Sequence, residues 1–241
     1  MSLEGKVALV VGGGTGIGKA IALSLAADGA KVAIAGRRFE VLEQVAAESD
    51  AEIHCHSVDV SDRASVKGLF EFVSKTLGSL DILVNAAGIN IKTRSMAEMT
   101  PEQWDQVMQI NATGGYNLMY EALPPMRQRK DGLIINISSI SGKRAYALGG
   151  IAYCASKFAM TALGTAAGNE VAADGVRITN IYPGEVETPI LEQRPAAPTA
   201  EHRARMLQPE DFSEVVLSIC HLPARAHVAE LIIKPTKQEY T

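Results

Sequence analysis

The segment KVALVVGGGTGIGKAIALSLAADG, residues 6–29, decides the fold. An apolar run at 6–11 reads as a buried strand and leads directly into a glycine-rich loop at 12–18, which is followed by residues of helical period. Gly12, Gly16 and Gly18 let the backbone turn tightly and bring the N–H groups of the helix start against a pyrophosphate. Many glycine turns bind nothing, but this one lies between a first strand and a first helix, which is the context that dinucleotide binding requires.

The composition bounds the class of protein. The chain of 241 residues is 47% hydrophobic and 21% charged, which suits one globular α/β domain. Its net charge of −4 gives no reason to expect nucleic-acid or membrane-surface binding. No apolar run approaches the roughly 20 residues that span a bilayer, and the start of the chain shows no signal-peptide pattern. We therefore expect a cytoplasmic protein without a membrane segment.

Cysteine and histidine usage argues against disulfides and metals. The three cysteines, Cys55, Cys154 and Cys220, are far apart and form no CxxC pair, which favours a reducing compartment. His54 and His56 share one side of a strand end, but no third ligand accompanies them. We therefore expect no metal site.

Strand patterns alternate with helix patterns along the whole chain. Helical period appears at 17–29, at 61–78 with Ser61 as N-cap, at 100–123 and at 153–175. Thr100, Pro101 and Gln103 form a capping-box sequence, and Gly175 ends the last of these segments. The expected strands are 6–11, 31–35, 52–58, 80–85, 132–138, 176–182 and 228–234. This alternation predicts one α/β domain over 1–241, a Rossmann-type doubly wound parallel sheet of about seven strands with helices on both faces. The proline-rich stretch at about 185–208 is predicted to be a lid or substrate loop.

The end of the second strand indicates which dinucleotide is preferred. An NAD-selective site places an acid there to hold the ribose 2′-hydroxyl, but this chain has Gly36 followed by Arg37 and Arg38. A guanidinium can pair with a 2′-phosphate, so NADP(H) is favoured and NAD(H) remains possible. The alternative, two solvated arginines at a helix start, stays open for Arg38.

Tyr153 and Lys157 are four residues apart in the segment AYCASKFAM, 152–160. On a helix they would share one face. A nearby ammonium favours the phenolate, and a tyrosine tuned in this way can give a proton to a carbonyl oxygen or take one from an alcohol. Such pairs are common by chance, so the pair alone decides little.

Several motifs together resemble the short-chain dehydrogenase/reductase family. They are the GxxxGxG loop, NAAG at 85–88, INISSISG at 135–142, the YxxxK pair and YPGEVETP at 182–189. Val11 stands where the family usually has threonine. The resemblance implies hydride transfer between a nicotinamide and a small carbonyl or alcohol substrate. The GxxxGxG spacing disfavours a methyltransferase, the short chain disfavours a sugar-nucleotide epimerase, and the YxxxK spacing disfavours an enoyl reductase.

The resemblance also implies site residues. The implied catalytic residues are Asn111, Ser139, Tyr153 and Lys157, with Asn111 bracing a water that links Lys157 to solvent. Ser139 precedes Tyr153 by 14 positions, one more than in many members, so Ser138 is the fallback and Ser141 a poorer one. The implied cofactor contacts, besides Tyr153 and Lys157, are Gly12, Gly14, Thr15, Gly16, Ile17, Gly18, Arg37, Arg38, Asp59, Val60, Asn85, Ala86, Gly88, Pro183, Gly184, Val186 and Thr188.

The C-terminal part suggests a subgroup and an assembly. The end HVAELIIKPTKQEYT, 227–241, resembles the branch that oxidises serine and other 3-hydroxy acids. The family's interfaces imply a homotetramer, with a dimer as the alternative. Glu185 either faces the pocket, where it would favour a cationic substrate, or is a solvated loop acid. The rival to an enzyme is a catalytically silent cofactor-binding regulatory protein of the same fold.

Overall fold

Seven parallel strands form one sheet in the computed structural model, which describes residues 2–239. The strand order is β3-β2-β1-β4-β5-β6-β7, so the chain reverses direction across the sheet between β1 and β4. The strands are β1 (Val7–Val11), β2 (Lys31–Gly36), β3 (Ile53–Ser57), β4 (Ile82–Asn85), β5 (Gly132–Ile137), β6 (Val176–Pro183) and β7 (Glu230–Ile233). The predicted Rossmann-type sheet of seven strands is confirmed.

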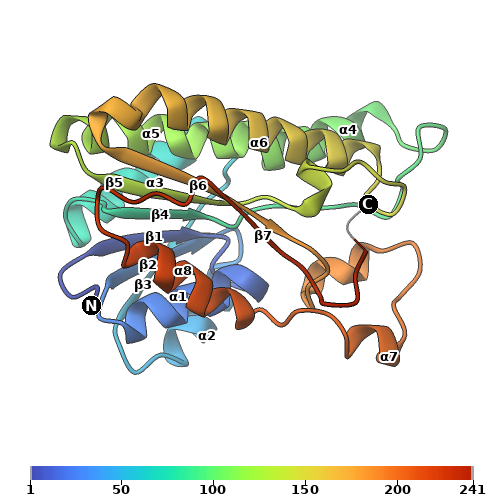
Figure 1. The fold of residues 1–241 in the computed structure, drawn as a ribbon, viewed down its shortest axis with the longest axis horizontal. Coiled ribbons are helices and arrows are strands. Elements are labelled where there is room, and N and C mark those ends of the chain that lie inside the picture. Colours follow the sequence, from blue (N-terminus) through green and yellow to red (C-terminus); the bar gives the residue numbers. More distant parts are fainter. Residues whose placement is uncertain (1, 240–241) are drawn as a thin grey trace.

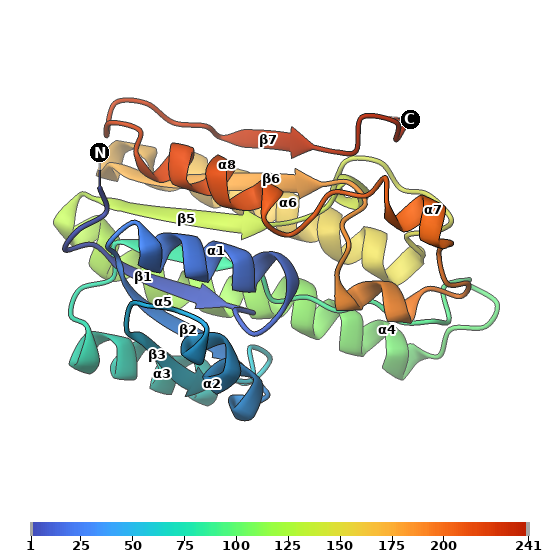
Figure 2. The same ribbon diagram turned by 90° about the horizontal axis from the view of Figure 1, so that it is seen from below.

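Helices cover both faces of this sheet (Figures 1 and 2). On one face lie α1 (Gly16–Ala27), α2 (Phe39–Ala47) and α8 (Asp211–Cys220). On the other lie α3 (Arg63–Thr76), α4 (Pro101–Met108), α5 (Gly114–Arg129) and α6 (Ile151–Val171). The short α7 (Ala200–Arg203) belongs to the segment that follows β6. No helix in residues 2–239 is long and apolar enough to cross a membrane.

The apolar strands are explained by burial on both faces of the sheet. In β1, Ala8 and Val10 join the core beneath α1, α2 and α8, while Val7, Leu9 and Val11 join the core beneath α3, α5 and α6. Every residue of β1 is therefore buried. Successive strand side chains point to opposite faces, so a strand buried on both sides shows a continuous apolar run rather than alternation.

Three details of the helices differ from the sequence prediction. The N-cap of α3 is Asp62, whose carboxylate accepts the Ala64 N–H; the Ser61 hydroxyl instead donates to Asp59. For the helix that starts at Arg37 and Arg38 the sequence gives no end, and α2 runs over Phe39–Ala47 with Arg38 as its N-cap. The helix expected to end at 123 continues through two prolines to Arg129, because Met126 beyond them is fully buried in the core.

Other helix ends agree with their sequence signals. Thr100 and Gln103 form the predicted capping box at the start of α4. After α6 a short 3-10 turn, Ala172–Asp174, leads to Gly175 at φ +75°, a left-handed conformation that favours glycine. Residues 184–208 contain the 3-10 helix Pro189–Gln193 and α7, and they lie beside the carboxyl edge of the sheet.

Candidate active site

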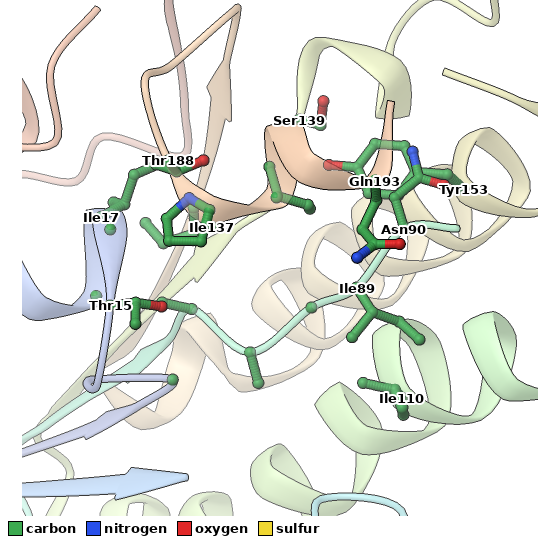
Figure 3. A pocket seen from close by; sticks show the side chains of 18 of the residues that line it. Thr15, Ile17, Ile89, Asn90, Ile110, Ile137, Ser139, Tyr153, Thr188 and Gln193 are labelled. Carbon is green, nitrogen blue, oxygen red and sulfur yellow. The ribbon is translucent and has the colours of Figure 1, made fainter. Parts of the chain in front are cut away.

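A cleft of about 670 Å³ opens at the carboxyl edge of the sheet, where the strand order reverses. Loops that follow six of the strands line it, as expected for the ligand crevice of a doubly wound sheet. Thr15, Ile17 and Thr188 lie at one end (Figure 3), and Ser139 and Tyr153 lie at the other. Of the site residues expected from the sequence, all but Asn85 and Asn111 line this cleft.

The glycine-rich loop can adopt its path only with glycine at two key positions. Gly12 has φ +85°, and a Cβ there would lie 2.6 Å from the carbonyl carbon of Ala86. A Cβ on Gly18 would lie 2.3 Å from the backbone oxygen of Gly12. Thr15 precedes α1 without a side-chain capping bond, so the first N–H groups of the helix remain available to an anion. The loop therefore fits a bound pyrophosphate.

The end of β2 carries positive charge into the cleft. Arg37 and Arg38 are exposed and line the cleft, and neither donates a hydrogen bond to another side chain among the described residues. Asp59 accepts hydrogen bonds from the N–H and hydroxyl of Ser61, which lower its pKa, and the charge of Arg37 lowers it further. No carboxylate occupies the Gly36 position.

Tyr153 projects from the first turns of α6 beside Ser139, which follows β5 (Figure 3). Burial against the cleft wall raises the pKa of Tyr153 to about 12, although hydrogen bonding with Ser139 acts in the opposite direction. The Oγ of Ser139 also accepts the Ser141 N–H at 3.1 Å. Ser141 is fully buried, and the Ser138 hydroxyl lies near the Lys157 carbonyl and Thr161.

Lys157 lies one turn further along α6 and is buried. Its Nζ lies 5.7 Å from the centroid of the Tyr153 ring and donates to the carbonyl of Ile137 at 3.0 Å. Burial lowers the pKa of Lys157 to about 8. The pair shares a helix face as predicted. In the protein without cofactor, however, burial raises the pKa of the phenol instead of the lowering expected from Lys157.

Asn111 lies behind the cleft wall rather than in it. It belongs to a π-helical turn, Gln109–Thr113, between α4 and α5. Its Oδ1 accepts the Ile89 N–H at 2.8 Å, and its Nδ2 donates to the Ile89 carbonyl and to the Ser156 hydroxyl. Ser156 in turn donates to the carbonyl of Tyr153. Asn111 thus connects the loop after β4 with the turn of α6 that carries Tyr153.

These features have a counterpart in known proteins. Residues 6–199 match the family model for short chain dehydrogenases. This chain belongs to the short-chain dehydrogenase/reductase family. It is therefore an oxidoreductase of that family. An oxidoreductase of Staphylococcus aureus (strain MW2) is 35% identical over 234 residues, covering 97% of this chain and 98% of the relative.

Solved structures of similar proteins cover the chain almost completely. The closed form of a serine dehydrogenase complexed with NADP+ has a TM-score of 0.90 and 30% identity, covering 97% of this chain and 96% of that one. The 3-ketoacyl-(acyl-carrier-protein) reductase of Brucella melitensis complexed with NADH has a TM-score of 0.88 and 29% identity, covering 98% and 99%. The serine dehydrogenase corresponds, by its name, to the serine-oxidising branch of the family that the C-terminal sequence of this chain resembles.

In this dehydrogenase/reductase, the expected cofactor residue Asn85 does not line the cleft. It lies in register with Asn136 of β5 and, through it, with Asn180 of β6, so that three buried asparagines form a row across the sheet. Asn136 donates to Asn180 at 3.2 Å. Gly115 packs against Asn85, and Gly164 packs against Asn180. A Cβ on Gly115 would lie 3.1 Å from the Asn85 Nδ2, and a Cβ on Gly164 would lie 2.2 Å from the Asn180 Oδ1. The side chain of Asn85 therefore packs within the sheet, and its contact with a cofactor stays a prediction.

Glu185 lines the cleft but is not the solvated acid that the sequence suggested as one alternative. Its carboxylate accepts hydrogen bonds from Arg194 and His202, both at 2.7 Å, and its side chain is 17% exposed. These bonds hold the pKa of Glu185 below its ordinary value, although burial opposes them. Glu185 therefore lines the cleft while its carboxylate is paired with Arg194 and His202 within the 184–208 segment.

Sequence reasoning missed most of the substrate end of the cleft. The loops after β4 and β5 and the segment after β6 contribute side chains that no motif marks: Asn90, Arg94, Tyr146, Leu148, Gln193 and Arg194. Asn90 and Gln193 line the same end of the cleft as Tyr153 (Figure 3). No group of three or more His, Cys, Asp or Glu side chains within residues 2–239 is placed to hold a metal ion.

Proposed function

We propose that the protein transfers a hydride between NADP(H) and a carbonyl or secondary alcohol, with Tyr153 as the acid or base. The observation that carries this proposal is the position of Ser139, Tyr153 and buried Lys157 at one end of a cleft whose other end is the glycine loop. The cleft therefore joins a helix start that can bind a pyrophosphate to a group that can donate a proton. Loss of turnover in Tyr153→Phe, with cofactor binding kept, is the test.

The residues present fit a nicotinamide dinucleotide. Gly12, Gly16 and Gly18 would hold its phosphates at the start of α1, and the small residues Ala86 and Gly88 would let it approach the backbone after β4. A Cβ on Gly16, which has φ +52°, would lie 2.9 Å from Thr188, so the residues of two loops meet over this part of the cleft. When bound, the cofactor supplies the hydride; the protein supplies position and a proton. Pro183, Gly184, Val186 and Thr188, which line the cleft after β6, are the further residues proposed to contact the nicotinamide, and Asn85 remains a proposed cofactor contact.

Tyr153 and Ser139 handle the proton and the substrate oxygen. With a pKa of about 12, the phenol is protonated near neutral pH and can donate to a carbonyl oxygen. Ser139 offers a second donor to the charge that grows on that oxygen. In the direction of alcohol oxidation, the phenol must lose its proton, so this rate rises with pH through the alkaline range. The rate of carbonyl reduction near neutral pH does not need that step.

Arg37 and Arg38 support a preference for NADP(H). Both line the cleft beside Gly36, and their guanidinium groups are available for a 2′-phosphate. The ratio of kcat/KM for NADPH over NADH tests this preference. In Arg37→Ala the ratio falls by roughly 10- to 100-fold if one charge-assisted bond is lost, whereas a smaller effect is expected for Arg38→Ala. Equal rates with both cofactors in the unmodified protein contradict the preference.

The similarity to a serine dehydrogenase supports a substrate of the 3-hydroxy acid or 3-oxo acid type. A screen that follows NADPH and NADH oxidation with aldehydes, ketones and 3-oxo acids or esters, and NADP+ reduction with 3-hydroxy acids, defines the class. The rival function is a cofactor-binding protein without turnover. This rival is favoured only if fluorescence shows that NADPH binds and the protein converts no substrate of this panel.

Exposed apolar side chains on α5, α6 and β7 support assembly into a homotetramer, with a dimer as the alternative. Tyr116, Tyr120, Phe158 and Ile232 are each more than 40% exposed. Exposed apolar side chains grouped on a few elements are typical of contact surfaces between subunits. Light scattering of the purified protein measures the molar mass directly, and a monomer contradicts the assembly. The three unpaired cysteines support a cytoplasmic location.

A further inference from the structure

Arg94 makes hydrogen bonds to three separate segments at the substrate end of the cleft. Its Nε donates to the carbonyl of Ile91 at 3.0 Å, its Nη1 donates to the carbonyl of Leu148, and its Nη2 donates to the carbonyl of Gln193 at 2.7 Å. The three acceptors belong to the loop after β4, the loop before α6 and the 3-10 helix after β6. A planar guanidinium with five N–H donors suits such a role, and a lysine ammonium does not reproduce it.

The surrounding backbone is shaped around this side chain. The Arg94 carbonyl accepts the Ile151 N–H at the first residue of α6. Gly150 has φ +82°, and a Cβ there would lie 2.8 Å from the Cβ of Arg94. Asn90 adds a parallel link, since its Nδ2 donates to the carbonyl of Gly149 at 3.1 Å. The loop after β4 is therefore fixed to the loop that leads into the helix carrying Tyr153.

Gln193 and its neighbour are held from opposite walls of the cleft. Arg94, in the loop after β4, donates a hydrogen bond to the Gln193 carbonyl. Arg194 donates a hydrogen bond to the carboxylate of Glu185, which follows β6. Both arginines and Gln193 line the cavity. The 3-10 helix Pro189–Gln193 is thus held across the substrate end instead of being attached only to β6.

We propose that Arg94 is a positioning residue that closes the substrate end of the cleft by fastening Gln193 to the loops at 88–94 and 143–150. The contacts stand independently of the reaction, but the kinetic consequences rest on the proposed function. Its location predicts an effect on substrate affinity rather than on cofactor affinity, because the Arg94 contacts lie at the opposite end from Arg37. The charge of Arg94 also lowers the pKa of Tyr153, so removing it raises that pKa.

Hydrogen exchange tests the contacts without any substrate. In Arg94→Ala, amides of residues 143–150 and 189–194 exchange faster than in the unmodified protein, while those of β1 are unchanged. Lys92→Ala is the matched control, because Lys92 is an exposed cation on the same loop that does not line the cleft. Unchanged exchange in Arg94→Ala with both segments still protected overturns the proposal, whatever the enzyme's activity.

Kinetics test the consequence. Arg94→Ala raises the KM of the carbonyl substrate about tenfold or more, because the Gln193 segment must then be ordered when the substrate binds, and leaves the KM of NADPH within about twofold. Millimolar guanidinium ion restores part of the substrate affinity. Arg94→Lys keeps the pH profile of alcohol oxidation but not the KM, whereas Arg94→Ala shifts that profile to higher pH. Equal substrate KM values in the unmodified protein, Arg94→Ala and Arg94→Lys overturn the proposal. If the unmodified protein shows no turnover, the proposed function is overturned, and the hydrogen-exchange result alone decides the role of Arg94.

Discussion

Replacing Lys157 by methionine should stabilise the protein at neutral pH even though it abolishes catalysis. Burial lowers the pKa of Lys157 from 10.5 to about 8. Each tenfold change in an equilibrium corresponds to about 1.4 kcal/mol, so the buried ammonium costs the folded state about 3 kcal/mol. The substitution also removes the hydrogen bond from the charged ammonium to the Ile137 carbonyl, which is worth about 2 kcal/mol. The net expectation is a gain of about 1 kcal/mol in the free energy of unfolding at pH 7.

The sign of this effect depends on pH. Below about pH 8 the folded and unfolded chains both carry the ammonium, and the folded chain bears the full cost of burying it. Between pH 8 and 10.5 the folded protein releases the proton while the unfolded chain keeps it, so the stability contributed by this group rises with pH. At pH 10.5 the unmodified protein has regained most of its stability, and Lys157→Met no longer has the advantage.

Urea unfolding of the cofactor-free protein at pH 7 and pH 10.5 measures this difference. Comparison with the mutant cancels the other groups that titrate at alkaline pH, and Lys92→Met controls for loss of an exposed lysine. If Lys157→Met is less stable than the unmodified protein at pH 7 by as much as at pH 10.5, the ammonium carries no burial cost. That result would contradict the assignment of Lys157 as a buried cation held beside Tyr153.

Three further predictions concern the cofactor loop, the π-helical turn and the end of β2. Gly18→Ala places a Cβ 2.3 Å from a loop carbonyl and should abolish NADPH binding measured by fluorescence; Gly68→Ala, with nothing within 4 Å, should not affect it. Asn111→Ala leaves the N–H and carbonyl of Ile89 without partners and should lower the free energy of unfolding by roughly 2–4 kcal/mol in urea titrations; a loss below about 0.5 kcal/mol contradicts the bracing role. Arg37→Asp should reverse the cofactor preference toward NADH in initial-rate assays, and retention of the NADPH preference refutes the role of Arg37.

The features that sequence could predict are those with local physical causes. The loop at 12–18 requires glycine because its backbone touches Ala86, and a conformational demand of this kind shows directly as residue type. The spacing of Tyr153 and Lys157 follows from the period of one helix. The two-sided burial of β1 is visible as an uninterrupted apolar run.

The features that sequence could not predict depend on contacts between distant segments. Arg94 binds residues 54 and 99 positions away, and nothing near it in the chain marks those acceptors. Glu185 looked like a free loop acid because Arg194 and His202 reach it only after the segment folds back. The sequence predicts that the charge of Lys157 lowers the pKa of Tyr153. The direction of the pKa shift depends instead on desolvation, which cannot be read from a sequence.

The measurement that tests the central claim most directly is the turnover number of Tyr153→Phe under saturating NADPH and substrate. General acid–base catalysis typically contributes 10²- to 10⁴-fold. We therefore predict that kcat falls by at least about 100-fold, while the Kd for NADPH, measured by fluorescence on the same sample, stays within about threefold. A kcat equal to that of the unmodified protein, with binding intact, would show that the proton travels by another group and would contradict the proposed function.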